Sequence, residues 1–183
     1  TETILKLKPK IKQDQLTKFD EGIITFEHFN EALSSDKNLV FLHIFLPHLG
    51  EEGDNFSQKI FETKVSGYKN QYLLNLKSTD LVLGKILNNI DKLVDDKHLI
   101  ILSSDHWFRE KDLTTDKSYP ALLLLKINNE NQYFLNNKKI SSTSINEIIH
   151  SFLDGNIDTH NKLNQLLNLQ KFFKPFSYKG RNF

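Results

Sequence analysis

Residues 39–46 read LVFLHIFL, a nearly continuous apolar run that stops at Pro47. The run is too short for a typical helix, and its lack of polar positions is typical of a strand covered on both faces, as in a parallel sheet. Two further runs share this character: residues 98–102 (HLIIL) and residues 121–127 (ALLLLKI). Together the three runs predict an α/β fold with a mostly parallel sheet flanked by helices.

The longest periodic segment lies between the first two runs. Apolar residues recur at helical spacing over residues 69–94 and predict one amphipathic helix. Strand, helix and strand in this order form a βαβ unit, whose crossover is nearly always right-handed. The polar stretch at residues 50–66 predicts a loop over one end of the sheet.

Shorter segments flank this unit. Residues 25–34 show helical spacing after a threonine that can cap the helix, and residues 143–153 show the same pattern before a glycine. Residues 159–173 predict a last helix, and residues 132–135 predict a short strand.

The length of 183 residues suits one domain with a sizeable core. No repeat or clear linker interrupts the chain, so we expect a single α/β domain over residues 1–183. Its core spans about residues 25–155, and a C-terminal helix with a basic tail occupies residues 156–183. Because the chain contains no Met, we expect it to be a fragment or a processed form of a longer protein.

The composition excludes several classes of function. Lys and Arg number 24 against 23 Asp and Glu, so no overall field attracts a polyanion and we expect no nucleic-acid partner. The absence of Cys excludes disulfides, thiolate metal ligands and a cysteine nucleophile within these residues. No apolar run reaches the length of about 18 residues that a membrane span needs.

The C-terminal residues 160–183 combine four lysines and one arginine with aromatic residues and contain no acidic residue. Such a segment can lie on an anionic membrane or bind nucleic acid. The alternative is a terminal helix whose aromatic side chains dock on the core, followed by a solvated basic tail. We favour the second interpretation.

Polar side chains follow two of the predicted strands. His48 comes after Pro47 at the end of the first, and Asp105 and His106 follow two serines at the end of the second. In open α/β sheets, ligands bind outside the carboxyl ends of the strands. An Asp beside a His offers an oxygen and a nitrogen that together suit Zn, Mn, Mg or Ca. The alternative is an Asp that caps the next helix and a solvated His.

The order of these motifs resembles the second half of sulfatase-like hydrolases and transferases of the alkaline-phosphatase superfamily. The resemblance rests on four strings, LVFLHIFLPHLG, YKNQYLLNLKSTDLVLGKIL, LIILSSDHWFR and YPALLLLKI, and covers about residues 39–127. It implies an alkaline-phosphatase-like fold that is present only in part. The HIFLPH version is most similar to membrane-anchored members of the cell envelope, whose catalytic domain is extracytoplasmic.

The resemblance also implies roles for individual residues. Asp105 and His106 correspond to a metal-ligand pair, and a divalent cation there neutralises the transferred sulfuryl or phosphoryl group. His48 corresponds to a catalytic position that contacts the substrate anion or protonates the leaving oxygen. The nucleophile belongs to the family's first half, which these residues do not contain.

Three further residues are candidates for substrate binding. His43 fits the envelope-type pattern, although a core histidine within a strand is the alternative. Arg109 can clamp an anion with two hydrogen bonds, and its alternative is a surface arginine. Trp107 stands where most relatives have Gly, so its indole narrows the pocket or stacks on the substrate.

Two functions from different classes follow. The first is the C-terminal part of a metal-dependent hydrolase or transferase, inactive alone, that acts on small-molecule or lipid-linked sulfate or phosphate esters. Its missing N-terminal part would provide any membrane association. The second is a non-catalytic α/β module that binds an anionic ligand or a protein partner, which the missing nucleophile and Trp107 favour. An unrelated ligand-binding domain is a third reading, but no Gly-rich phosphate loop supports nucleotide binding.

Overall fold

The computed structural model describes residues 8–10, 26–35, 39–94, 97–104, 121–128 and 140–168. The chain divides into two compact units, Thr1–Val94 and Asp95–Phe183. Among the described residues, no helix combines the length and the apolar character that crossing a membrane requires.

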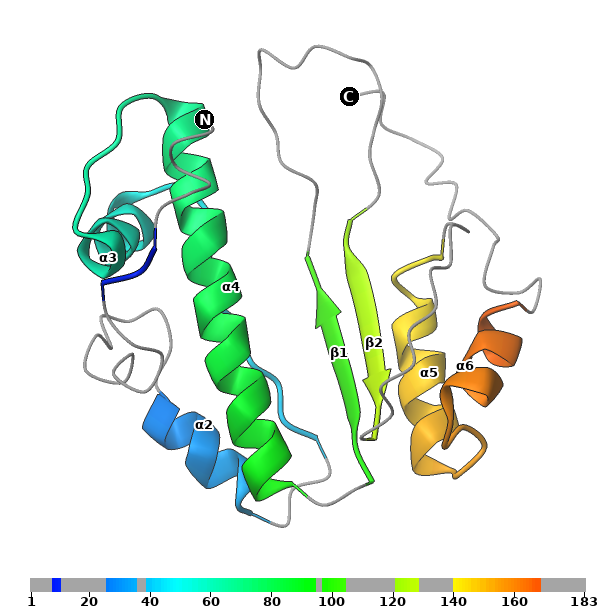
Figure 1. The fold of residues 1–183 in the computed structure, drawn as a ribbon. Helices are drawn as coiled ribbons and strands as arrows, with labels where there is room; N and C mark the ends of the chain where they lie inside the picture. The colour runs from blue at the N-terminus through cyan, green and yellow to red at the C-terminus, as the bar shows by residue number, and fades with distance from the viewer. Residues whose placement is uncertain are drawn as a thin grey trace, which may run out of the picture. The chain divides into compact units, whose positions relative to one another are not determined.

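The first unit is built from helices, namely α2 (Phe26–Leu33), α3 (Glu51–Phe61) and α4 (Tyr68–Leu93). Both α2 and α3 pack against α4, the long helix in Figure 1. The predicted helices at residues 25–34 and 69–94 are therefore confirmed. Asn89 on α4 donates a hydrogen bond from Nδ2 to Oδ1 of Asn30 on α2 at 2.7 Å, which joins these two helices beside their apolar contacts.

The core of the first unit lies between these helices. Its buried apolar side chains are Phe29, Leu46, Phe56, Ile60, Phe61, Leu74, Val82, Ile86 and Ile90. Lys77 on α4 extends over the Phe61 ring, with its ammonium nitrogen 5.6 Å from the ring centroid. This contact lets a charged side chain cover apolar surface at the rim of the core.

The predicted loop at residues 50–66 is wrong for most of its length, because residues 51–61 form α3. The buried face of α3 is made by Gly53, Phe56, Ser57, Ile60 and Phe61. Two of these five residues are small and weakly apolar. A count of large apolar residues therefore misses the periodicity that the helix uses.

The second unit combines the strands β1 (Leu99–Ser103) and β2 (Leu123–Ile127) with the helices α5 (Ser144–Leu153) and α6 (His160–Leu167). Its core holds the buried side chains of Ile127, Ile148, Ile157, Leu163 and Leu167. The predicted helix at residues 143–153 is confirmed, and Gly155 follows it with a φ of 73°. The predicted strand at residues 132–135 lies outside the described residues.

The predicted α/β fold with a mostly parallel, alkaline-phosphatase-like sheet is wrong. The described residues are mostly helical, and their sheet has two strands that pair antiparallel, with Leu99 opposite Ile127 and Ser103 opposite Leu123. Residues 39–45 are extended but form no strand with any described residue. The predicted βαβ unit is therefore absent from the described part of the chain. Apolar runs indicate buried strands without fixing the direction in which those strands pair.

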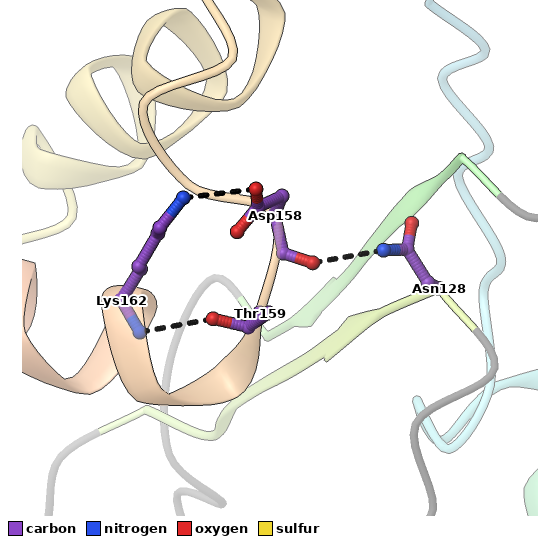
Figure 2. A network of polar contacts seen from close by, with 4 residues as sticks. All are labelled: Asn128, Asp158, Thr159 and Lys162. Atoms are coloured by element: carbon purple, nitrogen blue, oxygen red, sulfur yellow. Dashed lines mark hydrogen bonds and ion pairs between the residues drawn. The ribbon is translucent and has the colours of Figure 1, made fainter.

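One asparagine connects the sheet to the helices of the second unit. Asn128 follows β2 with a φ of 49°, a left-handed conformation that Asn tolerates better than most residues. Its Oδ1 accepts a hydrogen bond from the backbone N–H of His98 at 3.1 Å. Its Nδ2 donates to the backbone carbonyl of Asp158 at 2.9 Å, as Figure 2 shows.

The segment that Asn128 contacts leads directly into α6. The Thr159 hydroxyl accepts a hydrogen bond from the backbone N–H of Lys162 and caps this helix. The Lys162 ammonium lies 2.9 Å from the Asp158 carboxylate, and the hydrogen bond between them lowers the pKa of that carboxyl. Both side chains are exposed, so the ion pair contributes little to stability.

We expect Asn128→Ala to lower the free energy of unfolding of the second unit by about 1–2 kcal/mol, because two hydrogen bonds are lost and alanine disfavours a positive φ. Urea unfolding followed by circular dichroism measures the loss. Asn156→Ala, at an exposed position near the same helices, is the matched control. Equal losses in the two variants would show that Asn128 does not join the sheet to the helices.

Candidate functional site

The predicted catalytic residue His48 lies in a tight turn between the extended segment and α3. Leu46 before the turn is buried, and the Leu46–Pro47 peptide bond is cis. The backbone N–H of His48 donates a hydrogen bond to the carbonyl of Phe45 at 2.9 Å. The imidazole itself is exposed and meets the Phe45 ring edge-on, with 6.2 Å between ring centroids. The turn is thus anchored in the core by Leu46, and it exposes the His48 imidazole to solvent.

A buried asparagine on α4 holds this turn in place. The side chain of Asn75 is 0% exposed. Its Nδ2 donates to the backbone carbonyl of His48 at 3.0 Å and to Oδ1 of Asp54 on α3 at 2.8 Å. One amide therefore joins the turn, α3 and α4, which are separated by 21 to 27 residues in sequence.

Two glutamines extend the network along the interface of α3 and α4. Gln71 donates from Nε2 to Oδ1 of Asn75 at 2.9 Å, and Gln58 donates from Nε2 to Oε1 of Gln71 at 3.1 Å. Each amide in the row gives one hydrogen bond to the next, so the orientation of the Asn75 amide is set by its neighbours. The backbone carbonyl of His48 thereby has a fixed position relative to both helices.

A glycine permits the close approach of α3 to the turn. A Cβ atom built on Gly53 would lie 3.0 Å from the backbone carbonyl oxygen of His48, closer than nearly all real contacts of this kind. That oxygen is also held by Asn75. Gly53 therefore leaves room for the His48 carbonyl in the position where Asn75 holds it.

The charge next to the turn is negative. Three carboxylates, those of Glu51, Glu52 and Asp54, lie in the first turn of α3. Acidic residues at a helix N-terminus are stabilised by the helix dipole.

The other predicted site residues are distributed as follows. His43 is exposed, with its ring 5.7 Å from the Phe45 ring, so it is not a core histidine. The predicted metal ligands and two predicted substrate-binding residues lie outside the described residues; they are Asp105, His106, Trp107 and Arg109. Of the predicted site residues, the structure therefore places His43 and His48 within ring contact of Phe45.

The last described residue before Asp105 is tied to the neighbouring strand. The backbone N–H of Ser104 donates to the carbonyl of Leu122 at 3.2 Å. The backbone N–H of Leu122 donates in return to the Ser104 hydroxyl at 3.1 Å. The sheet thus fixes the position from which the chain continues to the predicted metal pair.

Within the described part of the chain, no group of three or more His, Asp or Glu side chains is arranged to hold a metal ion. Two hollows with volumes of about 410 and 300 Å³ lie on the first unit. The first is lined by the C-terminal part of α3 and the residues that follow it, and the second lies beside Phe61 and Lys77. Neither hollow is lined by His43 or His48.

Sequence reasoning missed Asn75, Gln71 and Asp54. A signal was present, because Gln71, Asn75 and Thr79 recur every four residues and mark one face of a helix. Apolar positions alone predict α4, and they do not show which groups this polar face contacts.

No family model matches the chain, and neither a curated protein nor a solved structure matches it. The resemblance to sulfatase-like enzymes therefore stays a prediction carried by the quoted motifs.

Proposed function

We propose that the chain is the C-terminal part of a metal-dependent hydrolase or transferase acting on sulfate or phosphate esters, with His48 at the reacting ester. One observation carries the proposal. The buried Asn75 amide on α4 forms hydrogen bonds with the backbone carbonyl of His48 and with the side chain of Gln71. His48 belongs to the quoted string LVFLHIFLPHLG, and Gln71 and Asn75 belong to the quoted string YKNQYLLNLKSTDLVLGKIL. Motifs that are 23 or more residues apart in sequence thus meet in one hydrogen-bond network. We also propose that this part of the protein is extracytoplasmic, as the resemblance implies.

His48 is suited to the role of proton donor to the leaving oxygen. Its backbone is held on both sides, by the Phe45 carbonyl at the N–H and by Asn75 at the carbonyl. Its imidazole is exposed and can reach a substrate without rearrangement of the fold. Fixing the backbone of an exposed acid lowers the entropic cost of aligning it with a bound ester.

The carboxylates in the first turn of α3 create a need for a cation beside His48 when an anionic ester binds there. A sulfate or phosphate ester that approaches His48 meets the carboxylates of Glu51 and Glu52. A divalent ion supplies the positive charge that offsets this repulsion and polarises the ester. The resemblance gives Asp105 and His106 as the ligands of this ion, and both lie outside the described residues.

We expect Asp105→Ala to weaken binding of Zn²⁺ or Mn²⁺ by about 100-fold or more. Residues that only hydrogen-bond to a metal ligand already change metal affinity by about 10–100-fold, and loss of a direct ligand should cost more. Isothermal titration calorimetry on the chain measures the affinity. Asp154→Ala, at an exposed position after α5, is the matched control and should bind as the wild type does. Unchanged affinity in Asp105→Ala, or no metal binding by the wild type, would remove the proposed ligand pair.

A further inference from the structure

A hollow of about 410 Å³ lies along the C-terminal part of α3 in the first unit. We refer to it as the α3 hollow. All six residues that line it carry polar side chains; they are Asn55, Gln58, Lys59, Glu62, Thr63 and Lys64. Ligand pockets in proteins commonly have volumes of about 300–1,000 Å³. The α3 hollow therefore has room for a small polar molecule.

The backbone at the end of α3 brings the second half of this lining back beside the helix. Glu62 adopts a left-handed conformation, with φ and ψ both 46°. Its N–H donates to the carbonyl of Lys59 at 3.2 Å, and the N–H of Thr63 donates to the carbonyl of Gln58 at 3.0 Å. These two bonds satisfy carbonyls of the last turn, so they reduce the negative potential that a helix C-terminus presents to an anion.

The lining of the α3 hollow carries a net positive charge. Lys59 and Lys64 supply two positive charges, against one negative charge on Glu62. The Gln58 amide and the Thr63 hydroxyl add neutral hydrogen-bond donors. Phosphate, sulfate and carboxylate oxygens accept several hydrogen bonds, and those from charged donors are the strongest. The lining thus favours a small oxyanion over a cation or an apolar molecule.

One residue of the hollow also belongs to the row of hydrogen bonds that holds the His48 turn. Gln58 donates from Nε2 to Oε1 of Gln71 at 3.1 Å. Gln71 donates to Asn75, and Asn75 donates to the backbone carbonyl of His48. An amide NH₂ group has two N–H donors, so Gln58 can donate to a ligand while it keeps its bond to Gln71. A ligand in the hollow therefore contacts one end of a continuous row whose other end is the turn.

We propose that the α3 hollow binds a small oxyanion, and that this ligand stabilises the His48 turn through the row formed by Gln58, Gln71 and Asn75. Binding holds the Gln58 side chain in the conformation that the row uses. By linkage, a ligand that prefers the closed row makes opening of the row less frequent. The site and its coupling to the turn do not require His48 to act on an ester, so they can be tested separately from the proposed reaction.

Titration of the chain with sodium phosphate tests the binding step by heteronuclear NMR, with the ionic strength held constant by sodium chloride. We expect saturable shifts of the Gln58 side-chain amide and of the Thr63 and Lys64 backbone amides. Lys64→Gln should weaken phosphate affinity by about tenfold, because it removes a charge-assisted hydrogen bond. Lys92→Gln, at an exposed position in the last turn of α4, is the matched control and should bind as the wild type does. Shifts that do not saturate, or unchanged affinity in Lys64→Gln, would overturn the proposal.

Hydrogen exchange of the His48 N–H tests the coupling step, because this N–H closes the turn on the Phe45 carbonyl. Phosphate at about ten times its Kd should slow this exchange by about two- to tenfold, the upper value applying if the open turn binds no ligand. Gln58→Ala should still bind phosphate through the lysines, but the ligand should no longer slow exchange at His48. Exchange that phosphate leaves unchanged in the wild type, or slows equally in Gln58→Ala, contradicts the proposal.

Discussion

Asn75→Ala is expected to lower the free energy of unfolding of the first unit by about 2–4 kcal/mol. The substitution removes a side chain that is 0% exposed and that makes three hydrogen bonds. It removes the acceptor of the buried Gln71 Nε2 group and the donor to the part-buried backbone carbonyl of His48. An unsatisfied buried polar group costs about 1–3 kcal/mol, so even incomplete relaxation leaves a large effect.

Urea unfolding followed by circular dichroism measures this loss, and hydrogen exchange at α3 and α4 localises it. Asn55→Ala is the matched control, because Asn55 is an exposed asparagine on α3. We expect the control to change stability by less than about 0.5 kcal/mol. Similar losses in the two variants would mean that the Asn75 network does not hold the turn.

His48→Ala is expected to lower kcat for ester hydrolysis by about 100-fold or more in the complete gene product, because a general acid contributes about 10²–10⁴. The imidazole is exposed, so the free energy of unfolding should change by less than about 0.5 kcal/mol. This combination separates a catalytic role from a structural one. Steady-state kinetics and urea unfolding on the same preparations measure both quantities.

His28→Ala provides the matched control for this prediction. His28 is an exposed histidine on α2 and belongs to the same unit as His48. Its replacement should leave kcat and stability unchanged. If His48→Ala retains wild-type kcat, then His48 is not the proton donor, and the turn that Asn75 holds serves only the fold.

The helical parts of the fold could be predicted where apolar residues dominate one face. The helix α4 repeats its pattern over seven turns, and its predicted start and end lie within one residue of the observed Tyr68–Leu93. The helix α3 could not be found in this way, because Gly53 and Ser57 occupy two of its five buried positions. Small residues pack well against a neighbouring helix but add little to an apolar pattern.

The sheet shows what an apolar run does not specify. Residues 98–102 and 121–127 were recognised as strands, and β1 and β2 lie there. The predicted parallel direction is wrong, because an apolar run of this kind also occurs in an antiparallel pair. Residues 39–46 have the strongest apolar run of the three, yet the chain provides them with no partner among the described strands. Strand pairing depends on neighbours that a single run cannot reveal.

The candidate site was predicted through residues that resemble catalytic motifs. This approach identified His48, which lies on a fixed and exposed turn. It did not identify Asn75, whose role depends on a hydrogen bond to a backbone group 27 residues away. The four-residue spacing of Gln71, Asn75 and Thr79 marks a polar helix face, but it does not show which backbone group that face contacts.

The most direct test of the central claim is a turnover assay of the complete gene product. Aryl phosphate and aryl sulfate esters are supplied with Zn²⁺, Mn²⁺, Mg²⁺ or Ca²⁺, before and after chelation by EDTA. We expect hydrolysis of at least one ester class, loss of that activity with EDTA, and its return with the divalent ion. No turnover of either ester with any of the four ions would contradict it and favour a non-catalytic binding module.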